Sequence, residues 1–319
     1  MWKALRQVLQ NTRMKQEDVS FEAQGTLVRG VLYRPDHSGA SACVVLANGF
    51  SGTMDWILPR FAERFASAGL AALVFDYRHL GRSGGMPRQI VDVKKQREDL
   101  RAAIGFARAQ VGIDRARVAL WGTSLGGSHA AAVAAEDREL GAVILNMPAL
   151  DALEGGADVE AKRRAAHVSR GAAVWTALRL LGAALDDGAR AVLGRPPRYL
   201  KVYGKPGEAF LTDPALAQNF ERLEKGSSTW ENRVAARFLL GVPRYREGTM
   251  ERIAAPMLVC LAEKDVEISN AYVADKAAKA PRAEVHTYPH DHFDLYHGTP
   301  FEELAAEQTA FLRRHLPAT

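Results

Sequence analysis

The stretch from Arg117 to Ala132 constrains the fold of this chain more than any other feature. A short apolar run ends in Gly122-Thr123-Ser124-Leu125-Gly126, and an alanine-rich segment comes next. A Gly-x-Ser-x-Gly pattern between a strand and a helix predicts a strained turn that exposes the serine hydroxyl, with the amino terminus of the helix beneath it. Because the pattern also arises by chance, the prediction depends on the strand before it and the helix after it. If Ser124 is a nucleophile, the chain must also supply a base, an acid and two oxyanion donors.

The bulk composition is that of an ordinary globular protein. The chain has 319 residues, of which 47% are hydrophobic and 25% charged. This length suits one large domain or a domain with a substantial insertion. The net charge of +5 comes from scattered arginines and not from a basic block, so nucleic-acid binding is not expected.

Cys43 and Cys260 lie in apolar, strand-like runs, which predicts buried free thiols in a reducing compartment. The amino terminus has no sustained apolar stretch of a secretory signal, and no apolar run reaches the roughly 18 residues of a membrane span. We therefore expect a cytoplasmic protein. Residues 2–10 are predicted to form an amphipathic helix packed on the protein body, with a homodimer contact or a membrane-surface role as the alternatives.

Apolar strand patterns alternate with helical patterns along most of the chain. Residues 19–33 have the pattern of a β-hairpin. Strands are predicted at 42–47, 70–75, 118–121, 142–145, 256–262 and 283–288, of which 42–47, 70–75 and 256–262 are expected to be buried, and helices at 59–68, 91–109, 270–280 and 301–315. This alternation predicts an α/β fold with a doubly wound, mostly parallel sheet. The loops after Ala47, Phe75 and Trp121 would then share the carboxyl edge of the sheet, where such folds place their chemistry.

The alternation of strand and helix patterns stops between about Met147 and Arg252. Strand-like runs nearly vanish, and helices are predicted at 172–185, 211–223 and 228–240. We interpret this part as a helical insertion that caps the carboxyl edge of the sheet, with a helical extension packed elsewhere as the alternative. The expected division is an α/β core at 1–147, the cap insertion at 148–252 and the rest of the core at 253–319.

Two loops near the carboxyl terminus supply candidates for the acid and the base. Asp265 comes after the strand that ends at Ala262, with Glu263 and Glu267 as weaker candidates. After the last strand there are three competing histidines, His290, His292 and His297. We favour His292 because it begins the His-Phe-Asp-Leu-Tyr run that leads towards the closing helix. A metal site is the less favoured alternative, because no ligand set beyond this loop is evident, and no metal or cofactor is expected.

Two backbone N–H groups are expected to hold the oxyanion. One belongs to Leu125, directly after the nucleophile, and the other to Phe50 in the loop Asn48-Gly49-Phe50. The chain order is then Ser124, Asp265 and His292, which is the order expected of an α/β-hydrolase triad.

On these residues the chain resembles the α/β-hydrolase superfamily over nearly its whole length. The motifs that carry the resemblance are the elbow at 122–127 and the loop Phe75-Asp76-Tyr77-Arg78-His79-Leu80-Gly81-Arg82-Ser83. Residues 87–89, 96–104 and 230–237 look like those of the branch that holds dienelactone-hydrolase-like and acetyl-xylan-esterase-like enzymes and fumagillin-type polyketide transferases. One departure is Asn48-Gly49, where the superfamily usually has His-Gly; Asn48 still has a side chain able to hold the loop by a local hydrogen bond.

The resemblance implies ester or thioester chemistry with Ser124, Asp265 and His292 as the triad. The expected function is therefore a serine hydrolase that acts on a small acyl ester or thioester. Acyl transfer to an alcohol is one alternative, and a non-catalytic binding protein on the same fold is another. Candidate residues for the apolar lining of the cap are Trp175, Phe210, Phe220, Trp230 and Phe238.

Overall fold

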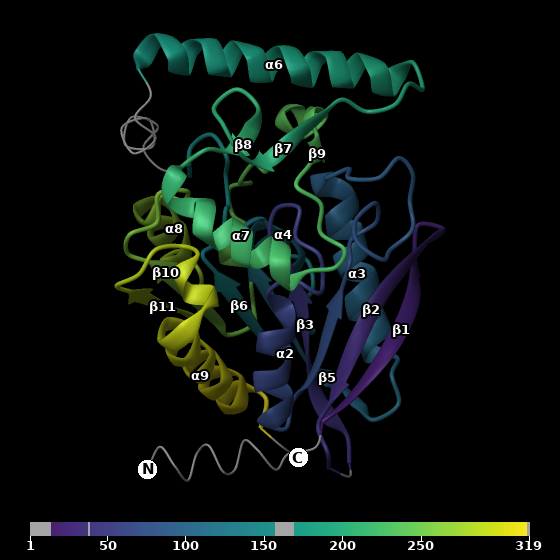
Figure 1. Cartoon of the computed structure of the whole chain (residues 1–319). Helices are drawn as coiled ribbons and strands as arrows, with labels where there is room; N and C mark the ends of the chain where they lie inside the picture. Colours follow the sequence, from purple (N-terminus) through teal and green to yellow (C-terminus); the bar gives the residue numbers. More distant parts are fainter. Residues whose placement is uncertain (1–13, 38, 157–168, 318–319) are drawn as a thin grey trace.

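The computed structural model describes residues 14–37, 39–156 and 169–317. An eight-stranded sheet runs through the centre in the order β1-β2-β4-β3-β5-β6-β10-β11 (Figure 1). Its strands are β1 (Lys15–Ala23), β2 (Thr26–Arg34), β3 (Ser41–Ala47), β4 (Ala71–Phe75), β5 (Ile113–Thr123), β6 (Ala142–Asn146), β10 (Met257–Ala262) and β11 (Ala283–Tyr288). The first two strands form an antiparallel hairpin, and the pairs from β4 to β11 are parallel. The predicted doubly wound, mostly parallel sheet is confirmed.

The central strands explain the continuous apolar runs in the sequence. Every residue of β3, β4, β6 and β10 is buried, as expected for parallel strands covered on both faces. Cys43 on β3 and Cys260 on β10 are both buried and free, so this part of the prediction is confirmed.

Five helices surround the sheet within the described residues: α2 (Leu58–Ser67), α3 (Val93–Arg108), α4 (Leu125–Ala134), α8 (Asn270–Ala277) and α9 (Gly298–His315). Helix α2 turns Leu58, Phe61 and Phe65 inward at helical spacing and packs beside α9. The Asp92 carboxylate caps α3 by accepting a hydrogen bond from Lys95 N at 3.0 Å. Helix α4 contacts both β5 and β6, which places its amino terminus at the carboxyl edge of the sheet.

Residues 148–252, which we call the intervening segment, lie between β6 and β10. Its elements are α6 (Arg170–Val192), β7 (Tyr199–Tyr203), β8 (Ala209–Leu211), α7 (Ala217–Gly226), β9 (Val234–Ala235) and the 3₁₀ helices η1 (Pro214–Leu216), η2 (Ala236–Leu240) and η3 (Met250–Arg252). In Figure 1 this segment lies above the sheet, with α6 outermost.

The helix predicted over 228–240 is wrong. The Asp55 carboxylate accepts hydrogen bonds from the backbone N–H of Ser228 and from the side chains of Ser227 and Thr229. These contacts replace the hydrogen bonds of a first helical turn. The chain then forms β9, which pairs with β7 in a three-stranded sheet that the sequence pattern did not predict.

Helix α6 presents its large apolar side chains outward. Trp175 is 67% exposed, and Leu178, Leu181 and Leu185 are also exposed. The buried positions are Ala183, Ala184 and Asp187. Trp175 is therefore not part of an apolar lining beneath α6, which corrects that expectation.

The amphipathic helix predicted at residues 2–10 lies outside the described residues. Within the described ranges, no helix combines the length and the apolar character needed to cross a bilayer.

Candidate active site

Ser124 occupies a sharp turn between β5 and α4. Its backbone has φ 53° and ψ −120°, a left-handed conformation that is strained for a residue with a side chain. Ser124 N donates to Asn146 O at 2.9 Å, and Ser124 O accepts from Ala149 N at 2.9 Å. At Gly126, a Cβ atom would lie 2.3 Å from Ala47 O, so only glycine allows the turn to approach β3 this closely. The observed geometry is that of the predicted elbow.

The loop after β3 passes directly beside the serine. A Cβ atom on Gly49 would lie 3.2 Å from Ser124 Cβ and 3.8 Å from Ser124 Oγ. Asn48 holds this loop, because its Oδ1 accepts from Gly49 N at 2.8 Å and its Nδ2 donates to Thr53 O at 2.7 Å. The expected local hydrogen bond of Asn48 is thus present.

Leu125 and Phe50 both have backbone N–H groups near this serine. In the part of the chain that the structure describes, neither N–H donates a backbone or side-chain hydrogen bond. Leu125 comes directly after Ser124, and Phe50 comes directly after Gly49, where an added Cβ atom would lie 3.2 Å from Ser124 Cβ. Both donors are therefore available to a ligand oxygen, as an oxyanion hole requires.

His292 and Asp265 meet at the same edge from two different loops. Nδ1 of His292 lies 2.7 Å from Oδ2 of Asp265. The other carboxylate oxygen of Asp265 accepts from the backbone N–H groups of Glu267 at 2.7 Å and Ile268 at 3.0 Å. A carboxylate can only accept, so the neutral imidazole carries its proton on Nδ1 and leaves Nε2 as an acceptor.

The two groups shift each other's pKa in opposite directions. Burial alone would lower the pKa of His292, but the charge of Asp265 and its hydrogen bond outweigh burial, so the pKa lies above 6.5. Burial alone would raise the pKa of Asp265, but the His292 contact and the two backbone donors bring it below 3.8.

The competing candidates do not share this geometry. His297 begins α9, and its Nε2 is buried without a partner among the described residues. Burial lowers the pKa of His297. His290 contributes its carbonyl, which accepts from Lys264 N at 3.0 Å. Glu263 is exposed on the loop beside Asp265. Of the three histidines, the structure brings His292 to the carboxylate.

Sequence reasoning missed Tyr296. Its hydroxyl lies 3.4 Å from His292 Nε2 and 2.7 Å from Oγ1 of Thr123, the residue directly before the serine in the chain. The residue is buried within the 3₁₀ helix η4 (Asp294–Tyr296). No local signal marks it, because its contact with Thr123 joins positions 173 apart in the sequence.

Asp55 ties the loop after β3 to the intervening segment. Its carboxylate accepts from Thr53 Oγ1 and Ser227 Oγ, each at 2.7 Å, and from Ser228 N and Thr229 Oγ1, each at 2.9 Å. The hydroxyl and backbone donors outweigh the effect of burial and lower the pKa of Asp55 below 3.8. This carboxylate was also missed, because its partners in the intervening segment lie more than 170 positions away in the sequence.

Aromatic side chains add to the contact between the loop after β3 and the intervening segment. Trp56 stacks on Trp230 with ring centroids 5.6 Å apart, and Trp230 Nε1 donates to Ser51 Oγ at 3.2 Å. Phe50 packs against Phe238 at 4.7 Å and against Phe210 at 5.0 Å. Three of the predicted lining residues, Phe210, Phe238 and Trp230, thus contact the loop that carries the Phe50 N–H.

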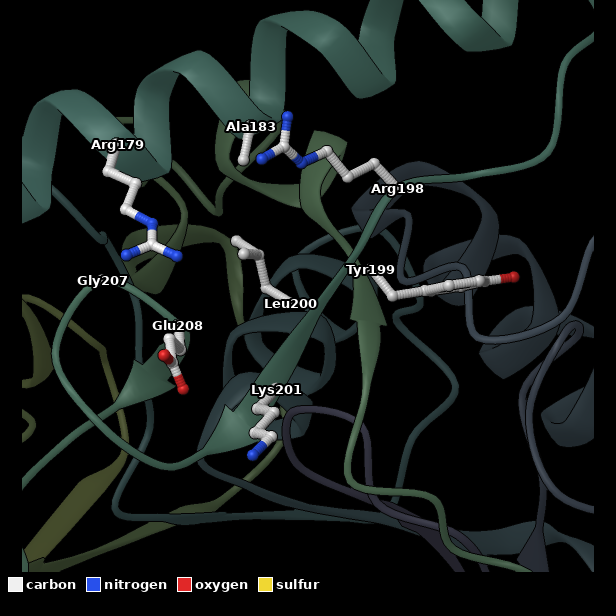
Figure 2. A pocket seen from close by; sticks show the side chains of 8 residues that line it. All are labelled: Arg179, Ala183, Arg198, Tyr199, Leu200, Lys201, Gly207 and Glu208. Atoms are coloured by element: carbon white, nitrogen blue, oxygen red, sulfur yellow. The ribbon is translucent and has the colours of Figure 1, made fainter.

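A cavity of about 250 Å³ lies between α6 and β7 (Figure 2). Four of its eight lining residues are charged, namely Arg179, Arg198, Lys201 and Glu208. Arg198 also pairs with Asp186 on α6 at 3.3 Å. The lining includes none of the three triad candidates and none of the aromatic residues that pack on Phe50.

Comparisons with known proteins agree with this geometry. The family model described as "Serine aminopeptidase, S33" matches residues 38–303. The "Quorum-quenching protein AidA" of Acinetobacter baumannii (strain MDR-ZJ06) is 37% identical over 311 residues, which are 97% of this chain and 98% of that protein.

Two fungal relatives carry names of different reactions. "Thiohydrolase aneE" of Aspergillus aculeatus is 39% identical over 128 residues, 40% of each chain. "Polyketide transferase grgF" of Penicillium sp is 25% identical over 312 residues, 95% of this chain and 98% of that protein. The predicted likeness to polyketide transferases is confirmed.

Among solved structures, the α/β hydrolase GrgF from Penicillium sp. sh18 superposes with a TM-score of 0.77 at 24% identity, covering 95% of this chain and all of that one. This similarity shows the fold. With the family model matching most of the chain, this protein belongs to the serine aminopeptidase S33 family and is an enzyme of the α/β-hydrolase fold.

Proposed function

We propose that this enzyme cleaves a carboxylic ester or a thioester through an acyl-enzyme on Ser124. The observation that carries the proposal is the 2.7 Å contact between His292 and Asp265 at the sheet edge that also holds the strained Ser124 turn. A serine hydroxyl is a weak nucleophile unless a positioned base takes its proton, and an oriented imidazole is such a base.

In the proposed reaction, Nε2 of His292 takes the hydroxyl proton as Ser124 Oγ attacks the acyl carbon. The negative charge that forms on the carbonyl oxygen is held by the N–H groups of Leu125 and Phe50. Asp265 stabilises the imidazolium, which then gives its proton to the departing alkoxide or thiolate. Water attacks the acyl-enzyme with His292 again as the base, and the carboxylic acid leaves.

We further propose that the intervening segment forms the acyl-binding side of the site. The division would be core 1–147, cap 148–252 and core 253–319. Support comes from the Asp55 hydrogen bonds and from the packing of Phe210 and Phe238 on Phe50, the residue whose N–H we propose as an oxyanion donor.

Acyl transfer is the second candidate function. It uses the same acyl-enzyme, with an alcohol in place of water in the second step. Full-length similarity to a protein named a polyketide transferase favours it, whereas the thiohydrolase name favours water. Product partitioning separates the two: an added alcohol diverts the acyl group to an ester only if the site binds that alcohol.

The decisive experiment is labelling with a fluorophosphonate probe, together with a substrate panel. The wild-type protein is expected to label and Ser124→Ala to remain unlabelled, with peptide mapping to Ser124. A folded wild type that fails to label overturns the proposal and favours a non-catalytic binding protein. The panel contains p-nitrophenyl esters, acyl thioesters and acyl lactones, the last because lactones are cyclic esters and one relative is named a quorum-quenching protein.

A further inference from the structure

Beneath the elbow, buried polar side chains form a continuous line of hydrogen bonds. The line begins at Trp121 Nε1, which contacts Gln308 Oε1 at 2.8 Å. Gln308 Nε2 contacts Asn146 Oδ1 at 3.2 Å, and Asn146 Nδ2 contacts Thr123 Oγ1 at 3.2 Å. These four side chains come from β5, α9 and β6, and none is more than 1% exposed. Two further contacts continue the line from Thr123 Oγ1 to Tyr296 at 2.7 Å and from Tyr296 to His292 Nε2 at 3.4 Å.

The donor and acceptor groups of these side chains determine which residue donates in each hydrogen bond of the line. The indole N–H of Trp121 can only donate, so Gln308 presents its oxygen to Trp121 and its amide N–H to Asn146. Asn146 then presents its N–H to Thr123 Oγ1. Each hydroxyl that accepts keeps its single hydrogen for the next member. Thr123 therefore donates to Tyr296, and Tyr296 donates to His292 Nε2.

We infer that Tyr296 is a positioning residue for the reaction, whose hydroxyl donates to the Nε2 lone pair of His292 and favours the neutral, basic imidazole in the resting enzyme. The inference rests on the proposed function, because it assigns His292 the role of base. The carboxylate of Asp265 holds one end of the ring, and Tyr296 holds the other.

The contact between the Tyr296 hydroxyl and His292 Nε2 is long for a hydrogen bond. Its 3.4 Å exceeds the roughly 2.8 Å of a close hydroxyl hydrogen bond, so the contact is weak and the proposed proton transfer from Ser124 can displace it. An imidazolium would instead point an N–H at the Tyr296 hydrogen. The Tyr296 oxygen has a second lone pair that can accept from an imidazolium, but the tyrosine hydrogen must then turn away from Nε2 and lose the acceptor that it has in the resting enzyme.

Other charges around His292 act in the opposite sense. Asp265 and Glu267 on the loop after β10, and Asp291 on the loop of the histidine itself, all favour the imidazolium. They remain in place when the tyrosine hydroxyl is removed. A comparison of Tyr296→Phe with the wild type therefore isolates the contribution of that hydroxyl.

The test measures the rate of fluorophosphonate inactivation and kcat/KM for a p-nitrophenyl ester against pH. In Tyr296→Phe the neutral imidazole loses a hydrogen-bond donor, so its pKa rises. The acidic limb of both pH profiles, where the rate increases as His292 loses its proton, is expected to move to higher pH by about 0.5–1 unit. The value of kcat is expected to fall about 10-fold with KM within about twofold, because the lost contact is to the base and not to the acyl group. A Tyr296→Phe protein with the wild-type limb overturns the inference, whatever its melting temperature.

Tyr288→Phe is the matched control, since its hydroxyl bonds to Glu307 on α9 away from the serine. This variant is expected to lose some thermal stability and to keep the acidic limb of the wild type. An equal shift of the limb in both variants overturns the inference.

If Tyr296→Phe does not fold, Thr123→Val replaces it. This change removes the hydrogen-bond donor to Tyr296 and is expected to move the acidic limb in the same direction. An unmoved limb in folded Thr123→Val overturns the inference as well. A wild type that neither labels nor turns over contradicts the proposed function instead, so the two failures are distinguishable.

Discussion

The imidazole of His292 and the carboxylate of Asp265 form a buried pair whose nearest atoms, Nδ1 and Oδ2, are 2.7 Å apart. Because the carboxylate raises the pKa of His292 above 6.5, the wild-type rate is expected to rise with pH through a midpoint above 6.5 as the base loses its proton. In Asp265→Asn the carboxylate is gone and burial, which lowers the pKa, remains. The acidic limb of kcat/KM should therefore move to lower pH, while kcat falls by about 10³- to 10⁴-fold as the ring loses its orientation.

Glu263→Gln is the control for this prediction. Glu263 is an exposed carboxylate on the same loop, and its replacement should leave both the rate and the limb at wild-type values. The assignment of the acid is wrong if Glu263→Gln is the more damaging change, or if Asp265→Asn keeps the wild-type limb.

A second prediction distinguishes the histidines. His292→Ala should abolish turnover of a p-nitrophenyl ester and slow fluorophosphonate labelling to the background rate, because Ser124 then has no base. His290→Ala should retain most of the activity, since the contact of this residue with Lys264 uses its carbonyl and survives the change. Initial rates at saturating substrate check both variants, and the reverse ranking would falsify the choice of His292.

The features predicted correctly from the sequence are those that local chemistry determines. The strands β3 and β10 are buried on both faces, so they appear as unbroken apolar runs. The elbow requires glycine where α4 approaches β3, which leaves a pattern around Ser124. The order of Ser124, Asp265 and His292 follows from the expected strand order, and the roles of these three residues stay predictions.

The features missed depend on partners that are distant in the chain. The 228–240 segment has helical periodicity, but Asp55 binds its first residues and β7 pairs with Val234 and Ala235. Periodicity also predicts the apolar stripe of α6 without saying which way it faces, and the small residues Ala183 and Ala184 turn inward. The contact between Tyr296 and Thr123 joins positions 173 apart, for which no local pattern exists.

A third prediction concerns the loop beside the nucleophile. In Gly49→Ala the new methyl group would lie 3.2 Å from Ser124 Cβ and 3.4 Å from Thr123 O, so the loop that carries the Phe50 N–H must shift. Loss of one oxyanion donor lowers kcat by about 10²- to 10³-fold in other enzymes, and we expect a loss towards the lower end, about 10²-fold. KM should change little. Steady-state kinetics on a p-nitrophenyl ester, with circular dichroism to verify folding, provide the measurement.

Gly105→Ala is the matched control for this substitution. Gly105 lies on the exposed side of α3, and a Cβ atom there meets nothing within 4 Å. Alanine should stabilise the helix by about 0.5–1 kcal/mol and leave kcat unaltered. Equal effects of the two alanines on kcat would remove the link between Gly49 and the oxyanion hole.

The last prediction concerns Asp55, whose half-buried carboxylate accepts hydrogen bonds from Ser227, Ser228 and Thr229. Asp55→Asn keeps the shape but replaces one accepting oxygen with a donor, so at least one hydrogen bond to the intervening segment is lost. The unfolding free energy should fall by about 1–3 kcal/mol, and KM should rise more than kcat falls, because the segment is held less firmly over the site.

The stability difference between Asp55→Asn and the wild type should depend on pH. The folded-state pKa of Asp55 lies below 3.8, so its contribution to stability is present above pH 3.8 and is lost as pH falls through the lowered value. Asp55→Asn should therefore differ most from the wild type near neutral pH and converge with it in strong acid. Melting temperatures measured across this range provide the check, with Asp18→Asn as an exposed ion-pair control that should track the wild type throughout. A constant difference at every pH would show that the hydrogen-bonding pattern of the Asp55 side chain, and not its charge, holds the segment.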